Sequence, residues 1–122
     1  MAKVKLVEVG PRDGLQNEQT PLPVAQRVKL IQKLASSGLT NIEVGAFVSP
    51  KWVPQMASTD KVVNQVFQLQ IAGKISPQVN FSTLVPNLRG MEGALKTPIK
   101  EIAIFGASSE SFSKKNINCT IK

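Results

Sequence analysis

The stretch Val9–Glu18, VGPRDGLQNE, decides how the rest of this sequence is interpreted. It follows a short apolar run, Val4–Val9, which predicts a buried β-strand. Proline, glycine, aspartate and asparagine are typical of turns, so a solvent-exposed loop is one interpretation of the stretch. The adjacent Arg12 and Asp13 are less typical of a plain loop, because they place a permanent cation and a potential metal ligand side by side at the end of a strand.

The composition is typical of one soluble globular domain. The chain has 122 residues, of which 42% are hydrophobic and 19% are charged, which is enough to bury a modest core. No apolar run comes near the length of about 20 residues that spans a bilayer, and no signal or transit segment precedes the first predicted strand. The single cysteine, Cys119, excludes an internal disulfide and fits a reducing compartment. We therefore expect a cytoplasmic protein with no membrane partner.

The absence of histidine excludes several kinds of site within these residues. Serine–histidine–aspartate and cysteine–histidine catalysis need an imidazole base, and histidine-ligated metal sites need imidazole ligands. The net charge of +7 fits a polyanionic partner. However, the basic residues are scattered and only Lys114 and Lys115 are adjacent, whereas nucleic-acid-binding surfaces cluster them on one face. We expect no nucleic-acid partner, and a non-catalytic basic interaction fragment stays the alternative from another functional class.

Two amphipathic segments predict helices. Apolar residues recur at helical spacing in Val24–Ala35, and Gly38 is placed to end this helix. We assign the lysines and the arginine of the segment to its solvent-exposed face. Ser58 is a candidate N-cap for the second helix, whose apolar stripe consists of Val62, Val63, Val66 and Phe67.

Three further apolar runs predict strands. They are Asn41–Phe47, Val79–Val85 and Ile99–Phe105. Between the last two, Asn87 can cap a short helix that continues to Leu95. With the first strand and the two helices above, the order is β-α-β-α-β-α-β. This order predicts parallel strands joined by right-handed helical crossovers.

Polar residues follow the predicted strands, and in a parallel array these positions share one edge, where α/β folds bind ligands. Glu43 lies within a strand instead, where a buried carboxylate needs a salt-bridge partner or a site that faces ligand. The loop Val48–Met56 contains two prolines and the only tryptophan, Trp52, either as a buried anchor or as one wall of a cleft. Neither a Rossmann nor a Walker pattern follows the first strand, so nothing supports a nucleotide-binding open sheet.

Two of these stretches carry a family resemblance. Glu8–Glu18, EVGPRDGLQNE, resembles the opening motif of the hydroxymethylglutaryl-CoA lyase family, and Phe47–Met56, FVSPKWVPQM, resembles its second signature. Shorter matches are Pro86–Gly90, Ile104–Ser108 and Lys114–Cys119. The resemblance therefore covers nearly the whole chain.

The resemblance implies an α/β fold: four consecutive βα units of a truncated TIM (β/α)₈ barrel with parallel strands. Residues 1–122 would form the N-terminal half of this single lyase domain, because a complete barrel takes about 250 residues. The implied reaction cleaves hydroxymethylglutaryl-CoA, an acyl-CoA thioester, into acetyl-CoA and acetoacetate, as in leucine degradation and ketone-body metabolism. The implied cofactor is a divalent cation, Mg²⁺ or Mn²⁺. We also expect a homo-oligomer, located in the cytoplasm or, for a processed eukaryotic form, in the mitochondrial matrix.

The resemblance also assigns roles to four residues. Asp13 matches the metal ligand of the family's first strand. Arg12 matches the arginine placed against the thioester carbonyl, where a fixed cation stabilises the enolate that forms as the carbon–carbon bond breaks. Glu43 matches a carboxylate that assists deprotonation or holds Arg12 in place. Gln16 is a neighbouring hydrogen-bonding residue for substrate.

Other family features have no counterpart in these residues. They are the remaining metal ligands, two histidines and an asparagine, and a glycine-rich loop with a catalytic cysteine; Cys119 matches a different, non-catalytic position. We therefore expect the fragment alone to be inactive, and its unpaired strand edges to favour self-association. Isopropylmalate or citramalate synthases, which are related Claisen-type acyltransferases, are the alternative enzymes. They share an Arg-Asp-Gly stretch but lack the Gly-Pro lead-in and the motif at 47–56.

Overall fold

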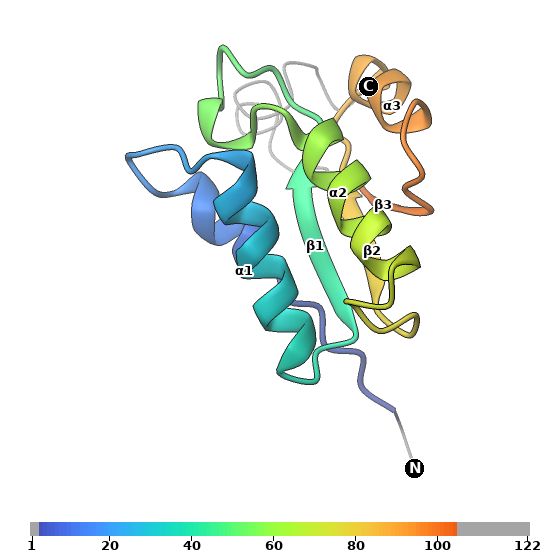
Figure 1. Cartoon of the computed structure of the whole chain (residues 1–122). Helices are drawn as coiled ribbons and strands as arrows, with labels where there is room; N and C mark the ends of the chain where they lie inside the picture. The colour runs from blue at the N-terminus through green and yellow to red at the C-terminus, as the bar shows by residue number, and fades with distance from the viewer. Residues whose placement is uncertain (1–2, 105–122) are drawn as a thin grey trace.

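The computed structural model describes residues 3–104, which form a parallel three-stranded sheet covered by helices (Figure 1). The strands lie in the order β1, β2, β3. In chain order the elements are the turn η1 (Gly10–Gly14), α1 (Val24–Ser36), β1 (Asn41–Ala46), the short turn η2 (Pro54–Met56), α2 (Thr59–Ile71), β2 (Asn80–Leu84), α3 (Leu88–Leu95) and β3 (Glu101–Ala103). Phe105, the last residue of the final predicted strand, and Cys119 lie outside the described residues.

The strands pair in parallel, as the β-α alternation predicts. Asn41 of β1 lies opposite Asn80 of β2, and Leu84 of β2 lies opposite Ala103 of β3. β3 is shorter than the predicted strand Ile99–Phe105. The expected fold class, consecutive βα units of a barrel, is therefore confirmed for the part with three paired strands.

The prediction of a β-strand at Val4–Val9 is wrong. Val4–Val9 joins the sheet through one bridge only, in which Glu8 lies beside Ile42. The N–H of Glu8 donates to the carbonyl of Asn41, and the N–H of Glu43 donates to the carbonyl of Glu8, both at 2.9 Å. Val4 and Leu6 are 83% and 71% exposed. An apolar run is buried in a parallel sheet only when elements cover both of its faces, and residues 3–104 do not cover this one.

One ion pair joins the N-terminal segment to the far strand of the sheet. Lys5 forms this pair with Glu101 of β3, with Nζ 3.1 Å from Oε1. Both side chains are about half exposed, so the pair adds little to the stability of the fold.

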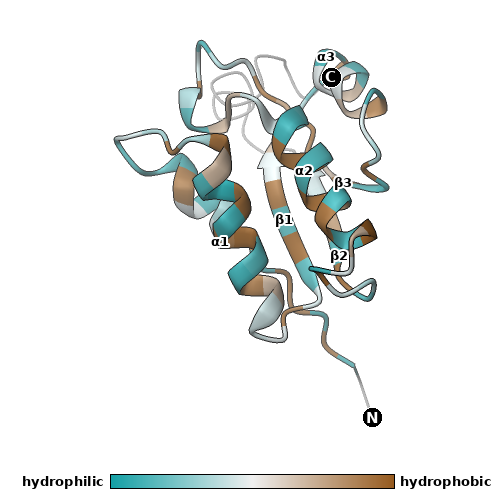
Figure 2. Ribbon diagram, viewed as in Figure 1, coloured by the Kyte–Doolittle hydropathy of each residue, from teal (hydrophilic) through white to brown (hydrophobic). Residues whose placement is uncertain are grey.

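The core lies between the sheet and the helices α1 and α2, which are apolar on one side and polar on the other (Figure 2). The predicted valine stripe of α2 is buried, and Phe67 packs edge-on against Phe81 of β2 with ring centroids 5.4 Å apart. The fully buried residues of this core include Ile31, Ile42, Val44, Val62, Val63 and Val66. Within residues 3–104, no helix has the length and apolar character needed to cross a bilayer.

The helix starts follow the sequence pattern, but only one cap forms as expected. Asn87 accepts a hydrogen bond from the N–H of Gly90 at 2.8 Å, so it caps α3 as predicted. Ser58 occupies the N-cap position of α2 in a left-handed conformation, with φ 60°, and makes no side-chain cap. Its backbone conformation is set by the preceding loop and does not follow the capping geometry.

We expect Gly90→Ala to destabilise the fold although alanine favours helix. A Cβ at Gly90 would lie 2.4 Å from the carbonyl oxygen of Phe47, and such overpacking costs about 1–3 kcal/mol. Urea unfolding measures the change in free energy of unfolding. Gly14→Ala is the control, because a Cβ there has no atom within 4 Å among the described residues. An equal effect of the two substitutions would contradict the close approach of α3 to Phe47.

Candidate active site at the rim of the sheet

The stretch that opens the sequence forms one wide helical turn, η1, beside the carboxyl end of β1. The N–H of Gly14 bonds to the carbonyl of Val9, and the N–H of Leu15 bonds to the carbonyl of Gly10. This spacing of five residues is that of a π-type turn, a rare conformation that is frequent at functional sites. Pro11 is buried at the start of the turn. A backbone N–H at this position would have no partner within the turn, so the absence of one in proline costs no hydrogen bond. The turn directs Arg12 and Asp13 to the rim.

Arg12 lies between two carboxylates. Its Nε donates to Oε1 of Glu43 on β1, and its Nη1 donates to Oδ1 of Asp13 at 3.2 Å. The side chain of Glu43 is 6% exposed, that of Arg12 19% and that of Asp13 56%. The guanidinium therefore connects a buried anion with one that faces solvent.

The contact with Arg12 accounts for the carboxylate within β1. A buried Glu43 without a cation would be strongly unfavourable, and the contact with the guanidinium offsets part of that desolvation. The rigid pair also limits the rotamers that Arg12 can adopt. Its position is consequently set by β1 and not by the turn alone.

Gln16 lies close to this pair in the chain but is not bonded to it. Its Oε1 is buried without a hydrogen-bond partner among residues 3–104. Asn17 donates from Nδ2 to the carbonyl of Asp13 at 2.9 Å and so stabilises the turn. An unpaired buried acceptor is rare in folded proteins, so Gln16 Oε1 is an exception among the described residues.

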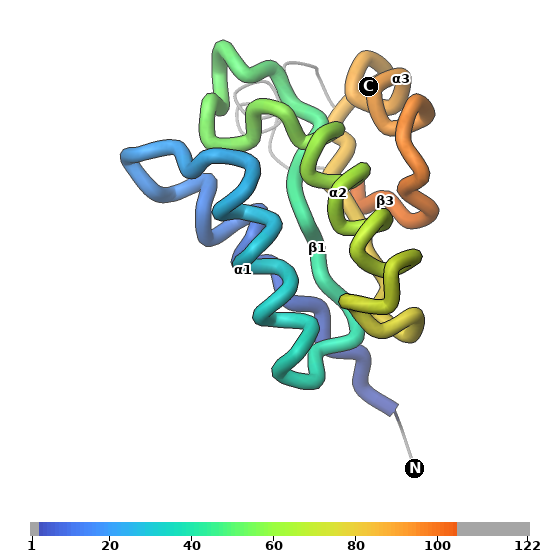
Figure 3. The backbone as a smooth tube through the Cα atoms, viewed as in Figure 1, coloured from blue at the N-terminus to red at the C-terminus, as the bar shows by residue number. Residues whose placement is uncertain are grey.

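A second loop contacts the segment that follows this turn. Gln55, in the loop 47–58 that links β1 to α2, donates from Nε2 to the carbonyl of Glu18 at 2.7 Å. Figure 3 shows the two loops approaching each other above α1. Trp52 on this loop is 83% exposed, so the buried-anchor interpretation of its side chain is wrong. Two prolines keep the loop irregular, as expected, apart from the short turn η2.

The described residues offer one metal ligand at the rim. Among residues 3–104, no group of three or more histidine, cysteine, aspartate or glutamate side chains is placed to hold an ion. Asp13 has an accessible carboxylate, which suits a hard cation, but Mg²⁺ takes six ligands in near-octahedral geometry. Asp13 therefore fits as a single ligand, and the other ligands would have to come from substrate, water or residues outside this range.

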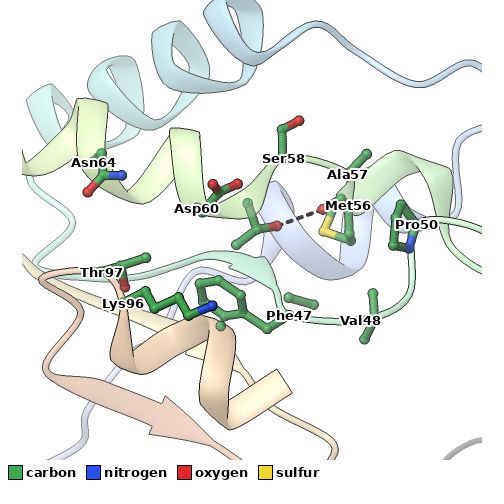
Figure 4. Close-up of a pocket in the computed structure, with 13 residues that line it drawn as sticks. Phe47, Val48, Pro50, Met56, Ala57, Ser58, Asp60, Asn64, Lys96 and Thr97 are labelled. Carbon is green, nitrogen blue, oxygen red and sulfur yellow. Dashed lines mark hydrogen bonds between the residues drawn. The ribbon is translucent and has the colours of Figure 1, made fainter. Parts of the chain in front are cut away.

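A separate pocket of about 340 Å³ lies between β1, α2 and α3 (Figure 4). Phe47 and Lys96 enter it from one side, and Asp60 and Asn64 from α2 on the other. None of the four predicted site residues lines it. Its lining is mixed in charge, so nothing in it favours a particular ligand.

One buried polar residue was missed by the sequence analysis. Arg27 was assigned to the solvent-exposed face of α1, yet it is only 1% exposed. Burial lowers the pKa of its guanidinium by desolvation. The spacing contained a signal, because Arg27 follows Val24 by three residues and precedes Ile31 by four, which places it on the apolar stripe.

Comparison with known proteins identifies the family. The HMGL-like family model matches residues 3–122, nearly the whole chain. The chain belongs to the HMGL-like family.

Members of this family with the same sequence pattern are named lyases. A Pseudomonas aeruginosa protein named 3-hydroxy-3-isohexenylglutaryl-CoA/hydroxy-methylglutaryl-CoA lyase is 53% identical over 120 residues, which is 98% of this chain and 38% of that protein. The chain thus spans less than two fifths of the length of this relative. Other relatives are named as mitochondrial and as cytoplasmic enzymes.

Solved structures of HMGL-like lyases share the fold. The crystal structure of hydroxymethylglutaryl-CoA lyase from Pseudomonas aeruginosa matches with a TM-score of 0.80 and 52% identity, covering 98% of this chain and 37% of that one. An HMG-CoA lyase from Acinetobacter baumannii, in complex with coenzyme A and 3-methylmalate, matches with a TM-score of 0.84 and 30% identity. That match covers 94% of this chain and 35% of the other.

We expect Arg12 to be coupled strongly to Glu43 and weakly to Asp13. Double-mutant cycles with Arg12→Met and Glu43→Gln should give a coupling free energy of about 1–3 kcal/mol, because the contact is largely desolvated. The cycle with Asp13→Asn should give less than about 1 kcal/mol, because that carboxylate is exposed. Urea unfolding of the single and double variants measures both. Equal couplings would contradict the role of burial.

Proposed function

We propose that the protein to which these residues belong cleaves hydroxymethylglutaryl-CoA into acetyl-CoA and acetoacetate. The observation that carries this proposal is Arg12, held by the buried Glu43 at the rim beside the exposed carboxylate of Asp13. Relatives of about 50% identity over nearly the whole chain are named for this reaction, and such identity favours the same chemistry.

Arg12 has the charge and the restraint that the reaction needs. Cleavage of the carbon–carbon bond leaves acetyl-CoA as an enolate, with negative charge on the thioester oxygen. A cation that is already fixed in place stabilises that charge without reorganising in the transition state. Glu43 supplies the restraint, because its bond to Nε holds the guanidinium while Nη2 can donate to a substrate oxygen.

Asp13 is proposed as one ligand of a divalent cation, Mg²⁺ or Mn²⁺. Such an ion, when bound, polarises the tertiary hydroxyl of the substrate and holds its distal carboxylate. The half-exposed carboxylate of Asp13 lies next to Arg12, so an ion there and the guanidinium would contact neighbouring parts of one substrate. Gln16 is proposed as a neighbouring residue that hydrogen-bonds to substrate through its side-chain amide.

The substrate proposal is supported by the relative that was crystallised with coenzyme A. We further propose that residues 1–122 form the N-terminal part of one barrel domain, that the protein acts in the cytoplasm, and that it is a homo-oligomer. The alternative is the condensation that a Claisen-type acyltransferase catalyses. An assay of the full-length protein separates the two, because a lyase cleaves hydroxymethylglutaryl-CoA whereas a synthase condenses acetyl-CoA with a keto acid.

Arg12→Gln in the full-length protein should lower kcat by about 10²–10³-fold, because it removes the charge that faces the enolate. Cleavage of hydroxymethylglutaryl-CoA, followed by acetoacetate formation, measures the effect. Thermal unfolding should move to a lower temperature, because Glu43 loses its cation, whereas circular dichroism should remain close to that of the wild type. Lys33→Gln, at an exposed position of α1, is the matched control and should leave kcat unchanged. A normal rate in Arg12→Gln would remove this residue from the reaction.

The 122-residue chain expressed alone should self-associate and should not turn over substrate. Val4 and Leu6 are exposed along one edge of the sheet, and Ile102 and Ile104 are 37% and 78% exposed near the other. Exposed apolar edges pair with other chains. Light scattering should therefore report a mass above the 13.2 kDa of one chain. A stable monomer, or measurable lyase activity, would contradict this expectation.

A further inference from the structure

Arg27 carries a buried charge that the proposed reaction does not use. Its Nη1 donates to the main-chain carbonyl of Ala57 at 2.5 Å, and its Nη2 donates to Oγ1 of Thr59 at 3.3 Å. Its Nε has no hydrogen-bond partner within residues 3–104. Arginine stays charged in proteins, so burying Arg27 to 1% exposure costs desolvation free energy. Burial at such a cost indicates that the contacts of Arg27 have a role in the protein.

The two acceptors of Arg27 lie on either side of a strained residue. Ser58, between Ala57 and Thr59, has φ 60° and ψ 32° and is the only non-glycine residue with positive φ in residues 3–104. A left-handed conformation is unfavourable for an L-residue with a side chain. Arg27 therefore clamps the chain immediately before and immediately after the strained position.

The clamped junction packs directly on β1. Thr59 donates from Oγ1 to the carbonyl of Met56 at 2.7 Å, the bond drawn in Figure 4. A Cβ at Gly45 would lie 2.8 Å from both Cγ2 and Oγ1 of Thr59 and 3.4 Å from Nη2 of Arg27. Only glycine leaves room for this approach.

The approach at Gly45 coincides with an irregularity in β1. The pairing of β1 with β2 shifts register between Glu43 and Gly45. An extra residue of this kind bends the strand and re-aims the neighbouring side chains, which is common beside active sites. Glu43, the residue at the start of the irregularity, is the one that holds Arg12.

We propose that Arg27 is a positioning residue for the candidate active site. By holding Thr59 against Gly45, it maintains the bend of β1 that aims Glu43 at Arg12. Its contact with the carbonyl of Ala57 acts in parallel, because it anchors the loop 47–58, in which Gln55 is bonded to Glu18 of the segment that follows η1. The effect on turnover rests on the proposed function, whereas the effect on the loop does not.

The first test compares Arg27→Met with Lys29→Met in the full-length protein. The second variant makes a similar change at an exposed position of the same helix. Arg27→Met should lower kcat by about tenfold or more with a smaller change in KM, because misplacing a group that acts in the transition state affects kcat first. Lys29→Met should stay within about twofold of the wild type. Arg27→Lys should be intermediate, because one ammonium replaces a fork that reaches two acceptors.

A second readout does not depend on lyase activity. In protein labelled with 5-fluorotryptophan, the ¹⁹F resonance of Trp52, assigned by its loss in Trp52→Phe, reports on the loop 47–58. Arg27→Met should shift or broaden it, and Lys29→Met should not. Ser58→Gly removes the backbone strain, so adding it to Arg27→Met should restore the resonance and part of the kcat.

The outcomes decide between the alternatives. An unchanged kcat in Arg27→Met overturns the proposal, whether or not the resonance moves, because Arg27 would then at most hold the loop. An unchanged resonance also overturns it. If Arg27→Met does not fold, Thr59→Val removes the hydroxyl at nearly the same volume and is judged by the same two measurements. If the wild type shows no lyase activity, the proposed function fails, and the resonance alone decides whether Arg27 positions the loop.

Discussion

The ion pair between Arg12 and Glu43 is the contact on which the rest of this rim depends. The pair joins the turn η1 to the buried strand β1. The segment before this turn has only one bridge to the sheet, so it holds the turn weakly. A carboxylate buried in β1 needs a cation, and the turn supplies one that is always charged. Because the pair fixes the turn against β1, Asp13 is held at the rim with its carboxylate facing solvent. The geometry of a potential enolate and metal site thus follows from one buried contact.

The site is held from the helix side as well as from the rim. The side chains of α1, α2 and β1 pack together in the core, and Arg27 extends from that packing to the junction that precedes α2. Gln55 links the same loop to the segment that follows the turn η1, through the carbonyl of Glu18. Groups placed on rigid elements and tied by outer contacts keep their geometry better than groups on isolated loops. The rim therefore behaves as two loops joined to each other and to one strand.

The motifs predicted the residues of the candidate site, but they did not predict all of the contacts that hold these residues in place. The pattern placed Arg12 and Asp13 at a strand end and found Glu43 to be an anomaly within a strand. It left open whether a salt bridge or a ligand accounts for Glu43, and the structure brings Arg12 to it. Arg27 was assigned to solvent because a charged residue on a helix usually is exposed. The exception depends on Ala57 and Thr59, about 30 residues further along the chain, and no local pattern contains that information.

By itself, the sequence determined the order of the elements after the first turn, the parallel sheet, the bounds of α1 to within a few residues, the start of α2, and the cap at Asn87. These features depend on periodicity and on contacts within one turn of chain, which a short window of residues contains. The tertiary structure decided which apolar runs are covered, and so left Val4–Val9 exposed apart from its single bridge. It also decided which charges are paired, because burial and ion pairing depend on surfaces that distant parts of the chain supply. That is the physical reason why the position of Arg12 and a possible contact with Glu43 were predicted, whereas the burial of Arg27 and its contacts with Ala57 and Thr59 were not.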